Sequence, residues 1–159
     1  QGRFVQDGSS SANDWAGFIP MDQIPQILNP ERGFVSSANQ ASTDQTYPYY
    51  YNSEGFDDYR GRIINRTLEE KNGMTVKDMM ALQNDNRSIL AEEALPLLLK
   101  LLDRNGLSPE ERTWVGWLEK WDLHFNAGEK APMVFSEWLR QTHRRAFDEI
   151  YVLDRKSVV

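Results

Sequence analysis

The chain has 159 residues and a mass of 18.4 kDa, a size that suits one domain, and its 40% apolar and 26% charged residues are typical of a folded protein. Acidic residues outnumber basic ones by 24 to 18, so nucleic acid and anionic membranes are not expected as main partners. The sequence contains no cysteine, which excludes disulfides, cysteine nucleophiles and thiolate zinc sites.

The first part of the chain, residues 1–56, is rich in residues that form turns. It contains four prolines and five glycines. Proline lacks a backbone donor and biases the residue before it away from helix. We therefore predict loops here, with one short strand at residues 33–39, which lie between Asn29-Pro30 and a polar stretch that begins at Gln40.

Residues 57–159 carry the spacing of amphipathic helices. Thr75 and Ser108 are both followed three residues later by an acidic residue, which is the pattern of a capping box at a helix start. Tryptophan and leucine recur at helical spacing after Ser108, and such a stripe is typical of a core-facing surface. The predicted helices cover residues 59–71, a long segment from 75 to 101 that Pro96 kinks or splits, a segment from Ser108 past Trp121, and residues 133–152. The predicted fold is mainly α-helical with a short strand and loop part at its N-terminal end.

Few residue groups suggest chemistry by themselves. His124 and His143 are about twenty residues apart without helical pairing, so we predict no metal site. The pairs Asp57-Asp58 and Glu110-Glu111 fall in first turns of predicted helices, where acidic residues offset the helix dipole. Residues 9–11 are serines, but the sequence has no Gly-x-Ser-x-Gly motif and no base near them. The tyrosines at 47 and 49–51 either line a binding groove, with Tyr49 and Tyr50 contacting substrate, or serve in packing.

Several segments together resemble one known family. Residues 14–20 read D-W-A-G-F-I-P and residues 29–40 read N-P-E-R-G-F-V-S-S-A-N-Q. Further on the chain reads Y-R-G-R-I at 59–63, L-Q-N-D-N-R-S-I-L-A at 82–91 and W-L-E-K-W-D at 117–122. In this order the segments are similar to the catalytic chain of the penicillin amidase (penicillin acylase) family of N-terminal nucleophile hydrolases. The resemblance covers nearly the whole chain.

The resemblance implies an αββα fold and hydrolysis of an amide through an N-terminal serine that autocatalytic cleavage creates. A side-chain amide and a backbone N–H would hold the oxyanion. Asn39 matches the oxyanion-hole asparagine, and a carboxamide can donate a hydrogen bond without carrying charge. Arg60 matches the arginine that orients this asparagine.

One departure limits what this chain does alone. The family nucleophile is the first residue of the catalytic chain, whereas residue 1 here is Gln1, which has no hydroxyl. We therefore expect a fragment, inactive by itself, with residues 1–56 carrying the asparagine motif and residues 57–159 forming a helical segment. Its expected partners are the rest of the parent polypeptide, namely the alpha chain and the N-terminal part of the beta chain, and a small acyl-amide substrate.

The resemblance further implies a periplasmic or secreted parent enzyme that needs no cofactor. The family often binds a structural calcium, but its ligands lie mostly upstream and none is identified here. Which acyl group is cleaved does not follow from these residues. The alternative interpretation is a non-catalytic helical interaction module that binds a peptide or glycan through its aromatic loop.

Overall fold

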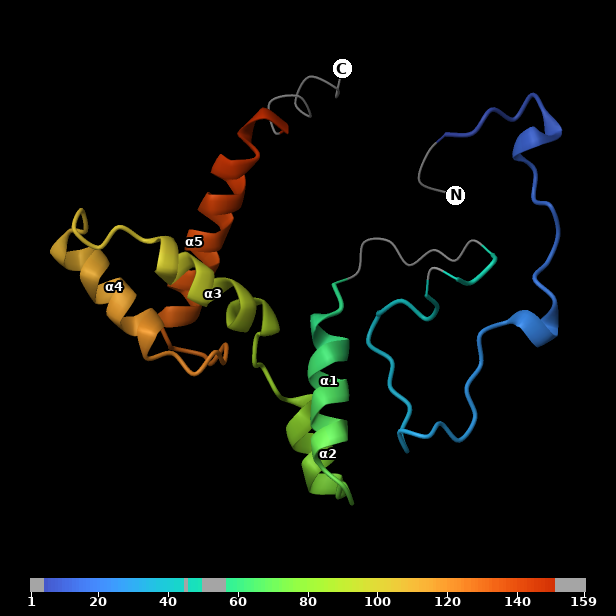
Figure 1. The fold of residues 1–159 in the computed structure, drawn as a ribbon, viewed down its shortest axis with the longest axis horizontal. Helices are drawn as coiled ribbons and strands as arrows, with labels where there is room; N and C mark the ends of the chain where they lie inside the picture. Colours follow the sequence, from blue (N-terminus) through green and yellow to red (C-terminus); the bar gives the residue numbers. More distant parts are fainter. Residues whose placement is uncertain (1–4, 45, 50–56, 151–159) are drawn as a thin grey trace. The chain divides into compact units, whose positions relative to one another are not determined.

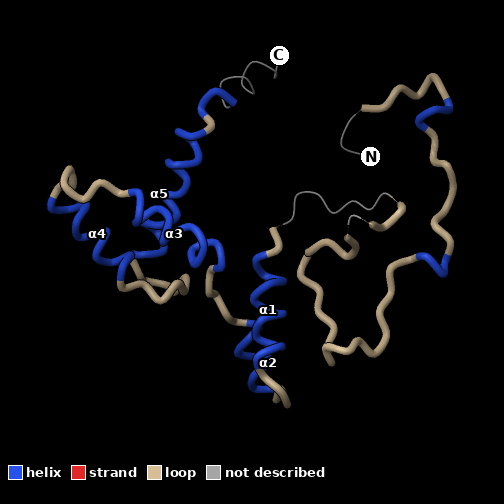
Figure 2. Tube along the Cα trace, in the orientation of Figure 1, coloured by secondary structure: helices blue, strands red, loops and turns tan. Residues whose placement is uncertain are grey.

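The structure is a computed structural model that describes residues 5–44, 46–49 and 57–150 (Figure 1). Its regular structure is helical, and no strand occurs in the described residues (Figure 2). The helices are η1 (Ser11–Asn13), η2 (Met21–Gln23), α1 (Tyr59–Glu70), α2 (Val76–Gln83), α3 (Ile89–Leu101), α4 (Pro109–Glu119) and α5 (Ala131–Ala146). The prediction of a mainly α-helical chain is confirmed. None of the helices in the described part is long and apolar enough to cross a membrane.

The chain divides into two compact units, residues 1–72 and 73–159. The first unit contains the turn-rich segment and α1, and the second contains α2 to α5. The sequence predicts a boundary between residues 56 and 57, where the pattern changes from loop to helix. That boundary stays a prediction.

The predicted strand at residues 33–39 is wrong. A turn precedes it, in which the amide of Gly33 bonds to the carbonyl of Pro30 at 2.9 Å and Gly33 adopts φ +75°. Another turn ends it, because Asn39 has φ +61°. Between these turns the side chain of Gln40, and not a neighbouring strand, bonds to the backbone of Ser36 and Ala38. The backbone groups that a strand would pair are thus satisfied locally.

Side-chain caps set the starts of three helices. Thr75 and Asp78 form a capping box at α2, and Ser108 and Glu111 form another at α4, as predicted. Ser88 caps α3, since its hydroxyl oxygen accepts from the amide of Ala91 at 3.1 Å. These side chains satisfy amide groups that the first helical turn leaves without partners.

Three predicted helices differ in extent from the structure. The one predicted from Ser108 past Trp121 ends at Glu119. The long segment from 75 to 101 is split at residues 84–88, before Ser88 starts α3, and not at Pro96, which lies inside α3. The last helix begins at Ala131 and is interrupted at Phe147, where the amide of Phe147 bonds to the carbonyl of His143. The predicted end of this helix, residue 152, lies outside the described residues.

The second unit has an apolar core between α3, α4 and α5. Phe135, Leu118 and Ala91 are almost fully buried, and Trp121 packs its ring against Phe135. The prediction that the tryptophan and leucine stripe forms core is confirmed for Leu118 and Trp121, whereas Trp114 is 38% exposed. In the described part of the first unit, the buried residues are Ala38, Gly61 and Ile63, and residues 36–40 make polar contacts with α1.

Candidate functional site

The loop at residues 36–40 lies against the first two turns of α1. The hydroxyl of Ser36 donates to Oδ1 of Asn65 at 2.6 Å, and the guanidinium of Arg60 donates from Nη2 to Oδ1 of Asn39 at 2.6 Å. The helix thus holds the loop at both ends, through residues that are five positions apart in α1.

Asn39, the predicted oxyanion donor, sits at a sharp turn and not at the end of a strand as expected. Its backbone adopts φ +61°, a left-handed conformation that asparagine tolerates better than most residues. The guanidinium of Arg60 has only donors, so the contact between them requires the carbonyl oxygen of the Asn39 amide. The amide NH₂ of Asn39, for which the structure shows no acceptor in the described residues, then remains a donor.

Gln40 holds the backbone just before Asn39. Its Oε1 accepts a hydrogen bond from the amide of Ala38 at 2.6 Å, and its Nε2 donates to the carbonyl of Ser36 at 3.2 Å. The same side chain rests on α1 at Gly61, where a Cβ atom would lie 3.1 Å from Gln40 Oε1. Sequence reasoning missed both residues. A glycine in the first turn of a helix, where alanine is the better helix former, is the signal that could have indicated a close approach.

Tyr49 contributes to the packing of the first unit. Its hydroxyl donates to the Gln23 side-chain carbonyl, and the Tyr47 hydroxyl donates to the Gln23 backbone carbonyl at 2.9 Å. The two rings meet edge to face with centroids 5.7 Å apart. The structure thus supports a packing role, and a substrate contact by Tyr49 stays a prediction. Tyr50, the other predicted substrate contact, lies outside the described residues.

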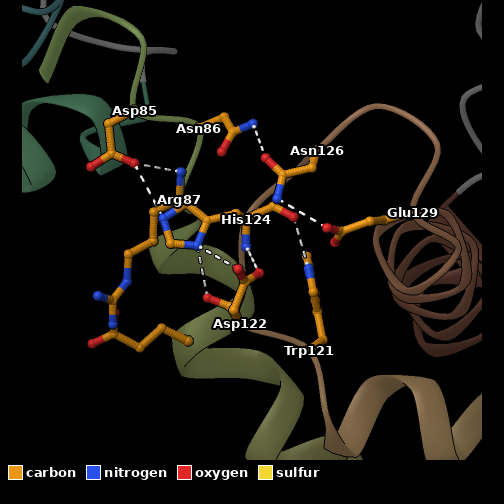
Figure 3. Close-up of polar contacts among 9 residues, drawn as sticks. Asp85, Asn86, Arg87, Trp121, Asp122, His124, Asn126 and Glu129 are labelled. Atoms are coloured by element: carbon orange, nitrogen blue, oxygen red, sulfur yellow. Dashed lines mark hydrogen bonds and ion pairs between the residues drawn. The ribbon is translucent and has the colours of Figure 1, made fainter. Parts of the chain in front are cut away.

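The motif segment at residues 82–91 meets residues 123–126, which follow the 117–122 motif, in a short antiparallel contact (Figure 3). The amide of Ser88 donates to the carbonyl of Leu123 at 2.9 Å, and the amide of Phe125 donates to the carbonyl of Asn86 at 3.2 Å. The side chains of Asn86 and Asn126 continue the contact at 3.1 Å. These contacts therefore join the start of α3 to the loop after α4, where residues 123–126 follow the motif at 117–122.

His124 lies inside this junction. Its Nδ1 is 3.0 Å from the carbonyl oxygen of Asp122, and its Nε2 is 3.7 Å from a carboxylate oxygen of Asp85 (Figure 3). Its own carbonyl accepts from the indole of Trp121 at 2.8 Å. These contacts give His124 a structural role. In the described part of the chain, no three acidic or histidine side chains are grouped so as to hold a metal ion.

The acidic pair at the start of α4 also has a structural role. The carboxylate of Glu111 accepts from the amide of Ser108 at 2.7 Å, and this hydrogen bond holds the pKa of Glu111 below its usual value. A low pKa suits a capping carboxylate and not a general acid. The helix-capping explanation for Glu111 is therefore supported.

Comparison with known proteins decides the family. The family model for penicillin amidase matches residues 1–157. The chain belongs to the penicillin amidase family. It is also 26% identical over 137 residues to the penicillin acylase 2 proenzyme of Pseudomonas sp. (strain SE83). That match covers 86% of this chain and 17% of the relative, so the chain spans about a sixth of the relative's length.

Within this penicillin amidase family chain, the structure brings together the two residues that the resemblance singled out. Asn39 and Arg60 are in direct contact, although 21 positions separate them. Both are exposed in the described structure, so the Asn39 amide is accessible.

Proposed function

We propose that this chain is part of an amide-bond hydrolase of the penicillin acylase type, in which Asn39 donates a hydrogen bond to the oxyanion of the tetrahedral intermediate. The observation that carries the proposal is the contact between Arg60 and Asn39 Oδ1 at 2.6 Å. It fixes which end of the amide accepts and leaves the NH₂ group to donate. A preorganised neutral donor of this kind stabilises negative charge as it develops on a carbonyl oxygen.

In the proposed reaction, the hydroxyl of an N-terminal serine attacks the carbonyl carbon of an acyl amide, and its own α-amine accepts the proton. The carbonyl oxygen becomes the oxyanion, which Asn39 and a backbone N–H stabilise. Collapse of the intermediate breaks the C–N bond and expels the protonated amine. Water then hydrolyses the acyl-enzyme and releases the acid. The serine and the backbone donor come from sequence outside this chain, so these 159 residues alone are inactive in this proposal.

The proposal includes the rest of a longer polypeptide as the partner. Three apolar side chains in or next to the family motifs are more than 85% exposed in the described structure, namely Trp15, Phe18 and Leu28. Exposed apolar surface of this kind is typical of an interface. We infer that the remaining polypeptide covers it and supplies the other layers of an αββα fold in an exported enzyme. The substrate is an acyl amide such as a β-lactam side chain, an acyl-homoserine lactone or a related amide.

The first test is to express the full-length gene and determine the N-terminal sequence and intact mass of each chain. The proposal expects a chain that begins with serine and extends through residues 1–159. A product that begins near Gln1, or one that is never cleaved, contradicts it and favours the interaction module that binds through its aromatic loop.

The second test is Asn39→Asp in the same polypeptide. Aspartate keeps the acceptor for Arg60 but lacks the NH₂ donor, so kcat should fall by about 10²–10³-fold. Asn29→Asp is the matched control, because Asn29 also has a left-handed backbone, with φ +48°. Unchanged kcat in Asn39→Asp would remove Asn39 from the reaction.

A further inference from the structure

We propose that Gln40 is a positioning residue for Asn39, and that Gly61 of α1 is the surface on which Gln40 rests. The inference rests on the proposed function, since it concerns how the oxyanion donor is held. It assigns no contact between Gln40 and substrate. Gln40 acts through the backbone that carries Asn39.

The side chain of Gln40 forms two hydrogen bonds to the backbone of residues 36–38, a pair that we call the Gln40 bracket. One end of its amide accepts from the Ala38 N–H and the other end donates to the Ser36 carbonyl. These peptide groups join residues 36–38, one residue before Asn39, whose φ of +61° is disfavoured for most residues with a side chain. Because these two hydrogen bonds hold the side chain of Gln40 against residues 36–38, they favour the turn in which Asn39 lies. Ala38 inside the bracket is buried, so little room remains for another arrangement.

The side chain of Gln40 also packs against α1 at Gly61. A Cβ at Gly61 would lie 3.1 Å from Gln40 Oε1, a tight approach, so a side chain at this position would force Gln40 to shift by a few tenths of an ångström. The neighbouring residue Arg60 bonds to Asn39. Contact between Gln40 and Gly61 therefore sets the distance over which Arg60 reaches the Asn39 amide.

A simple loop anchor would behave differently from a positioning residue. Ser36 is such an anchor, because its hydroxyl bonds to Asn65 of α1 without touching the peptide groups next to Asn39. Loss of this anchor should lower stability more than kcat. Loss of the Gln40 bracket should lower kcat while substrate binding, measured as KM, is kept.

The experiment uses the full-length polypeptide and a chromogenic acyl amide. Gln40→Met keeps the side-chain length without hydrogen bonds, and Gly61→Ala crowds Gln40 without altering it. We expect Gln40→Met to lower kcat by about 10- to 100-fold, with KM changed less than about threefold, because misplacing a reacting group by about 1 Å has an effect of this size. Gly61→Ala shifts Gln40 by only a few tenths of an ångström, so we expect it to lower kcat by a smaller factor, about threefold, at similar KM. Gly116→Ala is the control, since Gly116 also lies in a helix but has nothing within 4 Å of its Cβ position. It should leave kcat unchanged.

The double variant Asn39→Ala/Gln40→Met shows whether Gln40 acts through Asn39. If it does, the double variant is no slower than Asn39→Ala alone. If the double variant is slower than Asn39→Ala by the factor that Gln40→Met produces alone, the inference is overturned and the proposed function stays intact. The same holds if Gln40→Met has a normal kcat while Asn39→Ala is slow. A normal kcat in Asn39→Ala overturns the proposed function itself. If Gln40→Met does not accumulate as folded protein, Gly61→Ala decides alone: normal kcat there contradicts the role of the contact.

Discussion

The guanidinium of Arg60 and the side-chain amide of Asn39 form one hydrogen-bonded pair, with Arg60 Nη2 2.6 Å from Asn39 Oδ1. Arg60 lies in the first turn of α1, whereas Asn39 lies in a turn of the preceding loop. The pair assigns the two ends of a symmetric-looking amide, because a guanidinium donates and never accepts. Because Arg60 belongs to α1, the position of this helix determines in which direction the Asn39 NH₂ group points.

Arg60→Met should lower kcat of the full-length enzyme about tenfold and leave KM nearly unchanged. The methionine keeps most of the length but cannot donate, so the Asn39 amide is free to rotate and spends less time with its NH₂ group in the productive direction. Steady-state hydrolysis of an acyl amide measures this. Arg62→Met on the same helix is the control, since Arg62 contacts Asp58 and Tyr59. A similar loss in both variants would indicate a general effect of charge on α1.

Tyr49→Ala should raise KM about three- to tenfold at unchanged kcat if the ring borders the substrate, in keeping with the contribution of one aromatic contact. Tyr49→Phe retains the ring and loses only the hydrogen bond to Gln23, so its KM should stay normal. Michaelis constants of both variants are compared in the full-length enzyme. Unmoved KM in Tyr49→Ala would restrict Tyr49 to packing.

Ser108→Ala should destabilise the start of α4 by about 1 kcal/mol, because it removes one half of the capping box with Glu111. A local change of this size makes amide exchange about fivefold faster, which hydrogen-exchange mass spectrometry of residues 109–119 can measure. Thr113→Ala is the matched control in the same helix. Its hydroxyl bonds only to the carbonyl of Pro109, so its removal should change exchange little.

Glu137 should give α5 a small, pH-dependent stabilisation. Hydrogen bonds from Arg140, then from Gln141, lower the pKa of Glu137 from 4.5 to about 2. A carboxyl whose pKa is lower in the folded state stabilises that state above the unfolded pKa. This contribution is lost as pH falls from about 4.5 to about 2.

Glu137→Gln should therefore unfold at a lower temperature than the unchanged protein at pH 6, and the gap should narrow as the pH is lowered toward 3. The side chain is exposed, so the difference stays small. Thermal unfolding at a series of pH values measures it. In an Arg140→Met background most of the gap should vanish, and a gap that persists would locate the effect elsewhere.

The correct predictions depend on interactions between residues close in sequence, whereas the incorrect ones depend on contacts that the local pattern does not specify. The starts of α2 and α4 follow from Thr75 with Asp78 and from Ser108 with Glu111, pairs that lie within one helical turn. The predictions of a strand at 33–39 and of a break at Pro96 were wrong, because tertiary and side-chain contacts determine the backbone at these places. A side chain, Gln40, satisfies the backbone of the expected strand, and residues 84–88 leave the helix where they meet Leu123 and Phe125.

The sequence by itself determined the mainly helical character of the described chain, the caps of α2 and α4, and its membership of the penicillin amidase family. These depend on local spacing and on motifs in a fixed order. Only the tertiary structure decided that Asn39 lies in a left-handed turn, that Arg60 holds one end of its amide, and that Gln40 rests on Gly61. Those relations join residues about twenty positions apart, and their geometry depends on how the loop packs on α1, which no local pattern encodes.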